Sequence, residues 1–139
     1  MNAGELHRLA RVLREVALAA TSKPGEPVVS AGVIAVIEDV VDHPDSPVGE
    51  IALRTGLAQS MVSTTVARLR QSQVLRTRPD VADGRRTLVS LTPHIRATFL
   101  TRGAQPVEAA LRAARPEVDA NGLDRVMGAL AVLQQELVS

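Results

Sequence analysis

The chain has 139 residues, about one domain's worth, with 16 basic and 15 acidic residues, and its formal net charge of +1 does not by itself indicate a polyanionic partner. It contains no cysteine, which excludes a disulfide framework, a thiol-based redox switch and a cysteine-ligated metal. No apolar run reaches the length of a membrane span and no signal peptide is recognisable, so we expect a cytoplasmic protein.

The first part of the chain predicts two helices separated by a loop. Apolar residues recur at helical spacing over residues 6–16, and a helix ending near Ala20 accounts for them. Residues 21–27 contain two prolines and a glycine, which is typical of a loop. The nearly all-apolar run over residues 33–40 predicts a second helix that ends at His43, and we expect it to support the following segment from behind.

Residues 47–72 predict two more helices joined by a tight turn. Ser46 is expected to cap a helix whose first residue is Pro47, because the missing N–H of proline costs nothing at that position. Gly56 should end this helix, since the turn requires a residue that tolerates a positive φ. The second helix is then predicted over residues 58–72, which gives a helix-turn-helix.

The polar face of the second helix suggests contact with DNA. Short hydrogen-bonding side chains at its front have the chemistry that base edges in the major groove require, and two arginines follow near its end. An amphipathic helix with a solvated face explains the same pattern, and these residues alone do not decide between the two. The candidate residues are Gln59, Ser60, Ser63, Thr64, Arg68 and Arg70.

A predicted β-hairpin follows the second helix. Residues 74–79 and 86–91 alternate as short strands do, and residues 80–85 between them are rich in turn formers. Arg85 in this tip can enter the minor groove of DNA, and Asp83 can hold it by a charge-assisted hydrogen bond. An ordinary hairpin with a surface ion pair is the alternative, but its position directly after a helix-turn-helix favours a wing.

The positive charge is concentrated in this middle segment. Residues 1–46 have four basic and seven acidic residues, residues 93–139 have five of each, and residues 47–92 have seven arginines against three acidic residues, a local net charge of +4. A localised basic face is the electrostatic footprint of a nucleic-acid-binding protein. We therefore expect further attraction to the DNA backbone from Arg76, Arg78 and Arg86.

The C-terminal part predicts two helices, over residues 93–115 and 123–138, with breaks at residues 115–116 and 121–122. Pro106 lies inside the first of them and should kink or break it near Gly103. The chain contains a single aromatic residue, so its core must be aliphatic and must bury little apolar area for a chain of this size. Dimerisation is the obvious route to more buried area.

Residues 48–92 resemble the multiple antibiotic resistance regulator (MarR) family of bacterial winged-helix transcription factors. The Asp-x-Arg wing and the closing Leu-Thr are the most specific part of this resemblance. The residues that carry it are Glu50-Ile51-Ala52, Gly56-Leu57, Met61-Val62-Ser63, Val66-Ala67-Arg68-Leu69, Asp83-Gly84-Arg85 and Val89-Ser90-Leu91-Thr92.

The resemblance implies a mainly α fold with a small β-hairpin wing, a winged helix-turn-helix with flanking dimerisation helices. It implies a single domain over residues 1–139, with a DNA-binding lobe at residues 28–92 and dimerisation helices at residues 1–22 and 93–139. Two positions depart from the family pattern. Gln73 stands where a glycine is usual, so we expect left-handed backbone geometry there, and Thr92 with Pro93 is compatible with a helix start.

The resemblance also implies a function: a homodimer that binds a pseudo-palindromic double-stranded DNA operator, usually as a repressor. It implies that a small ligand can release the DNA, although nothing in the sequence identifies one and a protein without a ligand is equally compatible. The alternative is a winged-helix protein-interaction module, or a family member that has lost specific DNA binding.

Competing chemistry finds little support. There is no glycine-rich phosphate loop and no nucleophile motif, so we expect neither an enzyme nor a cofactor. The three histidines, His7, His43 and His94, form no helical ligand pair, and we expect no metal site. A carboxylate cluster near the end of the second helix is interpreted as a solvated face, and its members are Glu38, Asp39 and Asp42.

Overall fold

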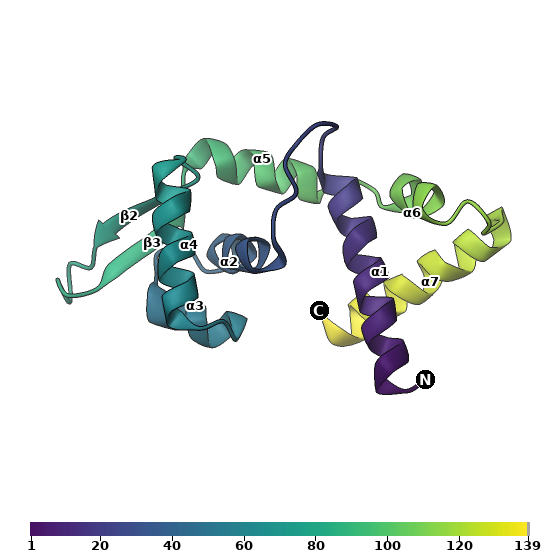
Figure 1. The fold of residues 1–139 in the computed structure, drawn as a ribbon, viewed down its shortest axis with the longest axis horizontal. Helices are drawn as coiled ribbons and strands as arrows, with labels where there is room; N and C mark the ends of the chain where they lie inside the picture. The colour runs from purple at the N-terminus through teal and green to yellow at the C-terminus, as the bar shows by residue number, and fades with distance from the viewer. Residues whose placement is uncertain (139) are drawn as a thin grey trace. The chain divides into compact units, whose positions relative to one another are not determined.

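The computed structural model describes residues 1–138, which form seven α-helices and one three-stranded antiparallel sheet (Figure 1). The chain divides into two compact units. Pro27–Leu100 forms the first, here called the winged-helix unit. Met1–Glu26 and the chain from Thr101 onward form the second, here called the terminal-helix unit.

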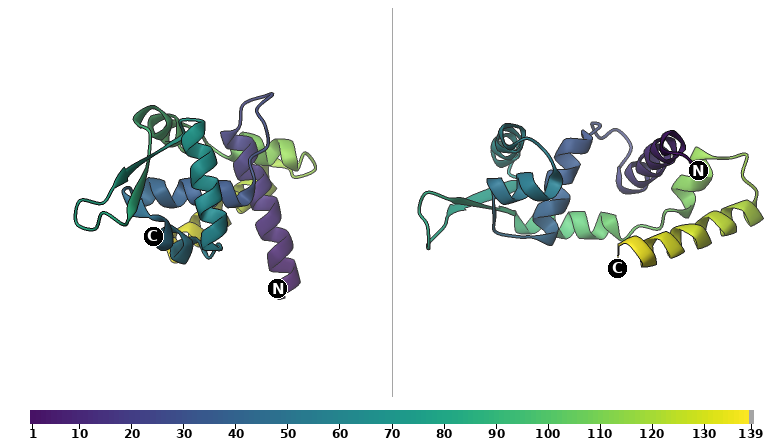
Figure 2. Two further views of the ribbon diagram at one scale, coloured as in Figure 1. Left: turned by 60° about the vertical axis from the view of Figure 1, so that its left-hand side comes forward. Right: turned by 90° about the horizontal axis from the view of Figure 1, so that it is seen from below.

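The winged-helix unit confirms the predicted mainly α fold with a small β-hairpin wing. Its sheet has the order β1-β3-β2, and the β2–β3 hairpin projects away from the helices (Figures 1 and 2). The elements are α2 (Ala31–Asp42), β1 (Ser46–Pro47), α3 (Val48–Thr55), α4 (Gln59–Gln71), β2 (Leu75–Pro79), β3 (Thr87–Leu91) and the first part of α5 (Pro93–Gly103).

An aliphatic core holds these elements together. Helix α2 packs against α3, α4 and β3, as expected for a helix that supports the helix-turn-helix from behind. Val36 of α2, Ile51 of α3 and Val62 of α4 are fully buried at its centre. Because these side chains come from three helices, their burial fixes the position of α4 relative to its supports.

The start of α3 differs from the prediction. Ser46 does not cap the helix: it belongs to β1, pairs opposite Val89 of β3, and its hydroxyl donates to the carbonyl of His43 at 2.7 Å. Helix α3 begins at Val48, with Pro47 as an N-cap that makes no side-chain hydrogen bond. The edge of β3 opposite the hairpin requires backbone partners, and the two-residue strand supplies them.

The turn after α4 confirms the left-handed geometry expected at Gln73, whose φ is 61°. The N–H of Val74 donates to the carbonyl of Leu69 at 2.9 Å, and the N–H of Gln73 donates to that of Arg70 at 3.1 Å. These two bonds form a Schellman motif. The Thr92 hydroxyl donates to the Gln73 carbonyl at 3.0 Å, so this turn also anchors the residue before α5.

The terminal-helix unit contains α1 (Ala3–Thr21), the end of α5, α6 (Glu108–Ala114) and α7 (Ala120–Leu137). The predicted break is confirmed, since α5 ends at Gly103 and Pro106 lies in the segment before α6. The break predicted at residues 121–122 is wrong. Asp119 caps α7 by accepting the N–H of Gly122 at 2.7 Å, so the helix starts earlier.

A bidentate ion pair joins the loop after α1 to the end of α5. Arg102 donates to the two carboxylate oxygens of Glu26 at 2.7 and 2.9 Å, and the N–H of Lys23 donates to the same carboxylate at 3.0 Å. The bonds from Arg102, followed by that from Lys23, hold the pKa of Glu26 below its usual value. None of the described helices is long and apolar enough to span a bilayer.

We expect Gln73→Gly to raise the free energy of unfolding by about 0.5–1 kcal/mol, because glycine adopts positive φ without the cost that a Cβ imposes. Gly56 has φ 71° at the end of α3, where a Cβ is costly. Gly56→Ala should therefore lower the free energy of unfolding by about 1 kcal/mol. Urea denaturation of both variants checks the pair. A destabilised Gln73→Gly protein would show that the glutamine side chain stabilises the turn.

We expect Glu26→Gln to lower the free energy of unfolding at neutral pH. Because the pKa of Glu26 is depressed in the folded chain, its stabilisation is fully present above the ordinary value of 4.5 and is lost as the pH falls through the folded pKa. Urea denaturation between neutral pH and about pH 3 should show wild type and variant converging. Glu136→Gln is the control, since Glu136 makes no ion pair within residues 1–138. A constant difference across this pH range would exclude the ionic explanation.

Candidate nucleic-acid interface

Helix α4 presents its predicted polar residues to solvent. Val62, Thr65 and Val66 are buried on its inner face. Two further exposed residues were not singled out from the sequence, Ala67 and Gln71. They follow Ser63 by four and eight positions, so they lie on the same face of the helix as Ser63. All six predicted residues of this helix are exposed: Gln59, Ser60, Ser63, Thr64, Arg68 and Arg70.

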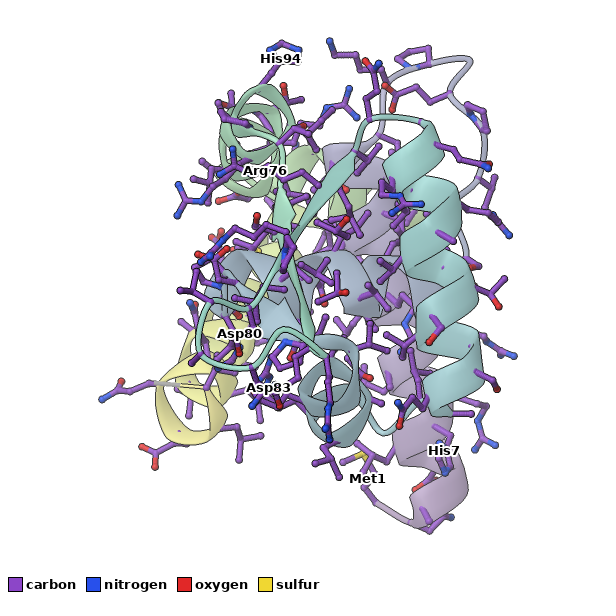
Figure 3. The ribbon with its side chains drawn as sticks, turned by 90° about the vertical axis from the view of Figure 1, so that its left-hand side faces the viewer. Met1, His7, Arg76, Asp80, Asp83 and His94 are labelled. Atoms are coloured by element: carbon purple, nitrogen blue, oxygen red, sulfur yellow. The ribbon has the colours of Figure 1, made fainter. Side chains whose placement is uncertain are left out.

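Two local turns shape the tip of the wing. The Asp80 carboxylate accepts the N–H of Ala82 at 3.0 Å, and the Asp83 carboxylate accepts the N–H of Arg85 at 3.1 Å. Figure 3 shows both aspartates on the loop that joins β2 and β3. Asp83 thus bonds the backbone of Arg85, where the sequence suggested a bond to its guanidinium, because an aspartate readily reaches the N–H two residues on.

Most arginines of the winged-helix unit have partners within it. Arg76 donates to Ser90 at 3.2 Å, Arg78 donates to Asp45 at 3.3 Å, and Arg70 approaches the Thr77 hydroxyl at 3.5 Å. By contrast, the guanidinium groups of three exposed arginines of this unit make no hydrogen bond or ion pair within residues 1–138. They are Arg68 on α4, Arg85 at the wing tip and Arg96 on α5.

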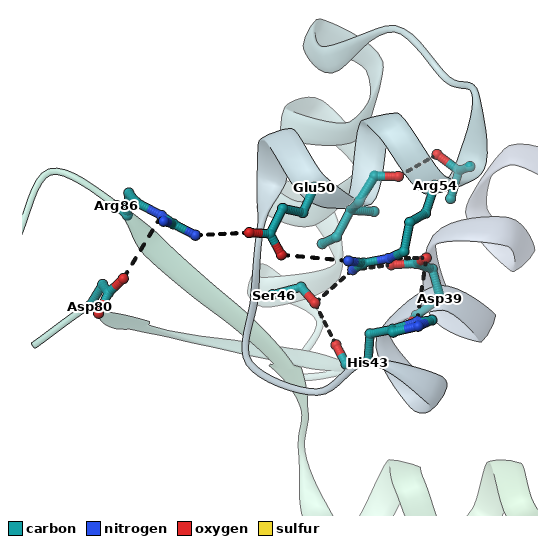
Figure 4. Close-up of polar contacts among 9 residues, drawn as sticks. Asp39, His43, Ser46, Glu50, Arg54, Asp80 and Arg86 are labelled. Carbon is teal, nitrogen blue, oxygen red and sulfur yellow. Dashed lines mark hydrogen bonds and ion pairs between the residues drawn. The ribbon is translucent and has the colours of Figure 1, made fainter. Parts of the chain in front are cut away.

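Arg54 is the most firmly held of these arginines. It donates to both carboxylate oxygens of Asp39 at 2.8 and 2.9 Å and to the Ser46 hydroxyl at 2.7 Å (Figure 4). The hydrogen bonds to Asp39 raise the pKa of Arg54 above its usual value. The Asp39 side chain is only 8% exposed. Interpreting it as part of a solvated face was therefore wrong, because α3 covers it and supplies its counter-charge.

Arg86 is held at the base of the wing. Its guanidinium lies 3.0 Å from the Glu50 carboxylate and 3.8 Å from that of Asp80. Glu50 also lies 3.5 Å from Arg54. Figure 4 shows the result, a chain of alternating charges from α2 through α3 to the hairpin.

His43 lies beside the α2 end of this arrangement. Its ring nitrogen Nδ1 is 3.8 Å from the Asp39 carboxylate and 3.3 Å from the Asp39 carbonyl. Within residues 1–138, no three histidine or carboxylate side chains gather in a way that could hold a metal ion.

Several solved structures have a similar arrangement of elements. Apo MarR of Escherichia coli is similar over 99% of this chain and 98% of its own, with 16% identity and a TM-score of 0.72. YusO of Bacillus subtilis covers 98% of this chain and 99% of its own, at 20% identity and a TM-score of 0.63. The chain has the MarR winged-helix fold. PcaV of Streptomyces coelicolor, solved with its natural ligand, covers 98% of this chain and 94% of its own, at 18% identity and a TM-score of 0.59.

The similarity lies in the fold, since no protein-family model and no curated protein sequence matches this chain. In this fold α3 and α4 form the helix-turn-helix, with α4 as its second helix, and the β2–β3 hairpin forms the wing. The residues predicted to contact DNA are thus on two neighbouring elements of one unit.

We expect Arg54→Gln to lower the free energy of unfolding by about 2 kcal/mol or more, because it leaves the covered Asp39 carboxylate without its counter-charge. The double variant Asp39→Asn, Arg54→Gln should cost less than the sum of the two single changes. Urea denaturation of the wild type, the two single variants and the double variant gives a double-mutant cycle. Additive losses would contradict direct coupling between the two side chains.

Proposed function

We propose that this protein is a sequence-specific DNA-binding transcriptional regulator that acts as a homodimer on a pseudo-palindromic operator. One observation carries the proposal: of the seven arginines in residues 47–92, the two whose guanidinium groups make no bond within residues 1–138 lie on the recognition helix and at the wing tip. Arg68 and Arg85 are therefore available to an external anion, and DNA presents anions to both elements in a winged-helix complex.

Helix α4 supplies the groups that read bases. Gln59, Ser60 and Ser63 are exposed near its start, where a recognition helix meets base edges. The Thr64 hydroxyl donates to the carbonyl of Ser60 at 2.9 Å, so toward a base it offers lone pairs and a methyl group. Arg68 follows one turn later, at the edge of the groove or on a phosphate.

The wing supplies a contact of a different kind. Arg85 is directed to the minor groove, where the potential is most negative. The two aspartate turns fix the backbone on which it stands, which reduces the entropy lost when its side chain binds. Arg70, Arg76 and Arg78 remain exposed beside their partners and add to the long-range attraction of the phosphate backbone.

Exposed apolar side chains on α1 and α7 support the homodimer. A soluble chain gains by covering such residues, and a second copy of the same surface is the usual cover. Two copies would present two recognition helices to two half-sites. The residues are Leu6 and Leu9 on α1, with Val132, Leu133 and Leu137 on α7.

If the operator overlaps a promoter, a protein bound to the operator represses transcription. A ligand that binds best when the two recognition helices have a spacing that does not fit the operator would release the DNA. DNA binding by BpsR of Bordetella bronchiseptica, which has a similar fold, is regulated by 6-hydroxynicotinic acid. We propose a small-molecule effector for this chain on that analogy. We also propose that the role is non-enzymatic.

The deciding experiment is the affinity of the purified protein for its own upstream intergenic DNA, compared with random duplex of equal length at two salt concentrations. Selective binding that weakens steeply with salt supports a DNA-binding regulator. Equal, weak binding to both duplexes would favour a winged helix that binds protein.

We expect Arg85→Ala to weaken operator binding by about 1–3 kcal/mol while leaving folding and dimerisation intact, because its guanidinium makes no bond within the described chain. Electrophoretic mobility shifts measure the affinity, and circular dichroism with sedimentation checks the fold and the dimer. Arg112→Ala on α6 is the matched control, an exposed arginine in the terminal-helix unit. Equal affinity of the Arg85→Ala and wild-type proteins would sink the wing assignment.

A further inference from the structure

Arg86 stands next to Arg85 in the chain but in a different environment. Arg85 has no partner for its guanidinium within residues 1–138, whereas Arg86 is paired with two carboxylates. Glu50 belongs to the first turn of α3, and Asp80 lies at the opposite end of the loop from Arg86 (Figure 4). Arg86 therefore connects the two ends of the wing loop to each other and to α3, which lies 36 residues earlier in the chain.

These contacts close the base of the wing loop. The N–H of Asp80 donates to the carbonyl of Arg86 at 2.9 Å, and the N–H of Arg86 donates to that of Asp83 at 3.0 Å. The ion pair between the side chains of Asp80 and Arg86 adds to the first of these bonds. The loop that carries Arg85 is thus tied at its base by backbone and side-chain contacts together.

The same guanidinium ties the loop to the helix-turn-helix. Arg86 donates to Glu50 at 3.0 Å, and Glu50 also faces Arg54, which is fixed to Asp39 of α2. A hairpin joined to the rest of the unit only through its strands can twist about its long axis. A side-chain tie from its base to α3 restricts that twist and hence the position of the tip.

The surrounding charge makes Arg86 a poor phosphate ligand. A phosphate would have to displace Glu50 and Asp80 or approach them closely, and like charges at such distances repel. The neighbouring Arg85 offers a guanidinium without that competition.

We propose that Arg86 is a positioning residue: held by Glu50 and Asp80, it fixes the base of the wing against α3, sets the place of Arg85, and itself contacts no DNA phosphate. This proposal rests on the proposed function and replaces the sequence-based expectation that Arg86 adds to backbone attraction. Its partner Glu50 thereby becomes a residue that supports DNA binding although it carries the same charge as DNA.

Glu50→Gln separates the two roles by the sign of its effect. If Arg86 were a phosphate contact restrained by Glu50, the change would free it and remove a repulsive charge, so affinity for the duplex would rise. The positioning role requires the affinity to fall, by about two- to fivefold per half-site for an exposed ion pair. Glu38→Gln on α2 is the matched control, because Glu38 is exposed and has no ion pair within residues 1–138.

Arg86→Gln should weaken binding to a similar extent while leaving the slope of log Kd against log salt unchanged, because no phosphate contact is lost. Arg68→Gln and Arg85→Gln should each make that slope shallower by about one per half-site. Arg86→Lys keeps the positive charge but lacks the planar guanidinium that reaches two carboxylates, so it should behave like Arg86→Gln. A shallower slope for Arg86→Gln, full activity of Arg86→Lys, or tighter binding by Glu50→Gln would each overturn the proposal.

Amide hydrogen exchange of the free protein provides a readout without DNA. Exchange at the N–H groups of Asp80 and Arg86 should accelerate in Glu50→Gln and Arg86→Gln and stay unchanged in Glu38→Gln. If the wild-type protein binds no DNA, the proposed function fails while this experiment still tests the tie. Unchanged exchange in both variants would show that Arg86 does not hold the wing.

Discussion

The ion pair between Asp39 and Arg54 is the contact on which the proposed DNA-binding surface depends. It joins α2 to α3, and through the Ser46 hydroxyl it reaches the short strand that completes the sheet. The aliphatic core beside it supplies most of the stabilisation but little directional information, because Val, Leu and Ile can repack at small cost. The bidentate geometry of the pair specifies one relative position of the two helices, and α4 follows from α3.

The seven arginines of residues 47–92 differ in what they bind. Arg54, Arg78 and Arg86 pair with carboxylates and hold elements together, and Arg70 and Arg76 contact hydroxyl groups. Arg68 and Arg85 have no side-chain partner within residues 1–138. A local net charge of +4 conceals this division. Within residues 47–92, fewer guanidinium groups are unpaired than this net charge suggests, and the two unpaired ones stand on α4 and on the wing, the elements that we propose meet a duplex.

The sequence predicted most elements because helical periodicity, turn glycines and strand alternation are local signals. The left-handed turn at Gln73 was expected from the family resemblance, since a glycine is usual at that position. What it missed depends on contacts between distant residues. Ser46 looked like a cap because its partner strand lies about forty residues on, and Asp39 looked solvated because Arg54 is on another helix. For the candidate site, the polar face of α4 was predictable from spacing, but which arginines are already occupied was not.

The strand order β1-β3-β2 leaves β2 with one unpaired edge, a row of backbone groups that can recruit a strand from another molecule. This strand reads Leu-Arg-Thr-Arg-Pro, with guanidinium groups at Arg76 and Arg78 and a proline at its end that cannot donate a ladder hydrogen bond. The two arginines that we propose attract DNA to the wing thus also keep its edge from pairing with the wing of a neighbour. Neutralising Arg76 and Arg78 together would leave this edge without its charges and make it prone to aggregation.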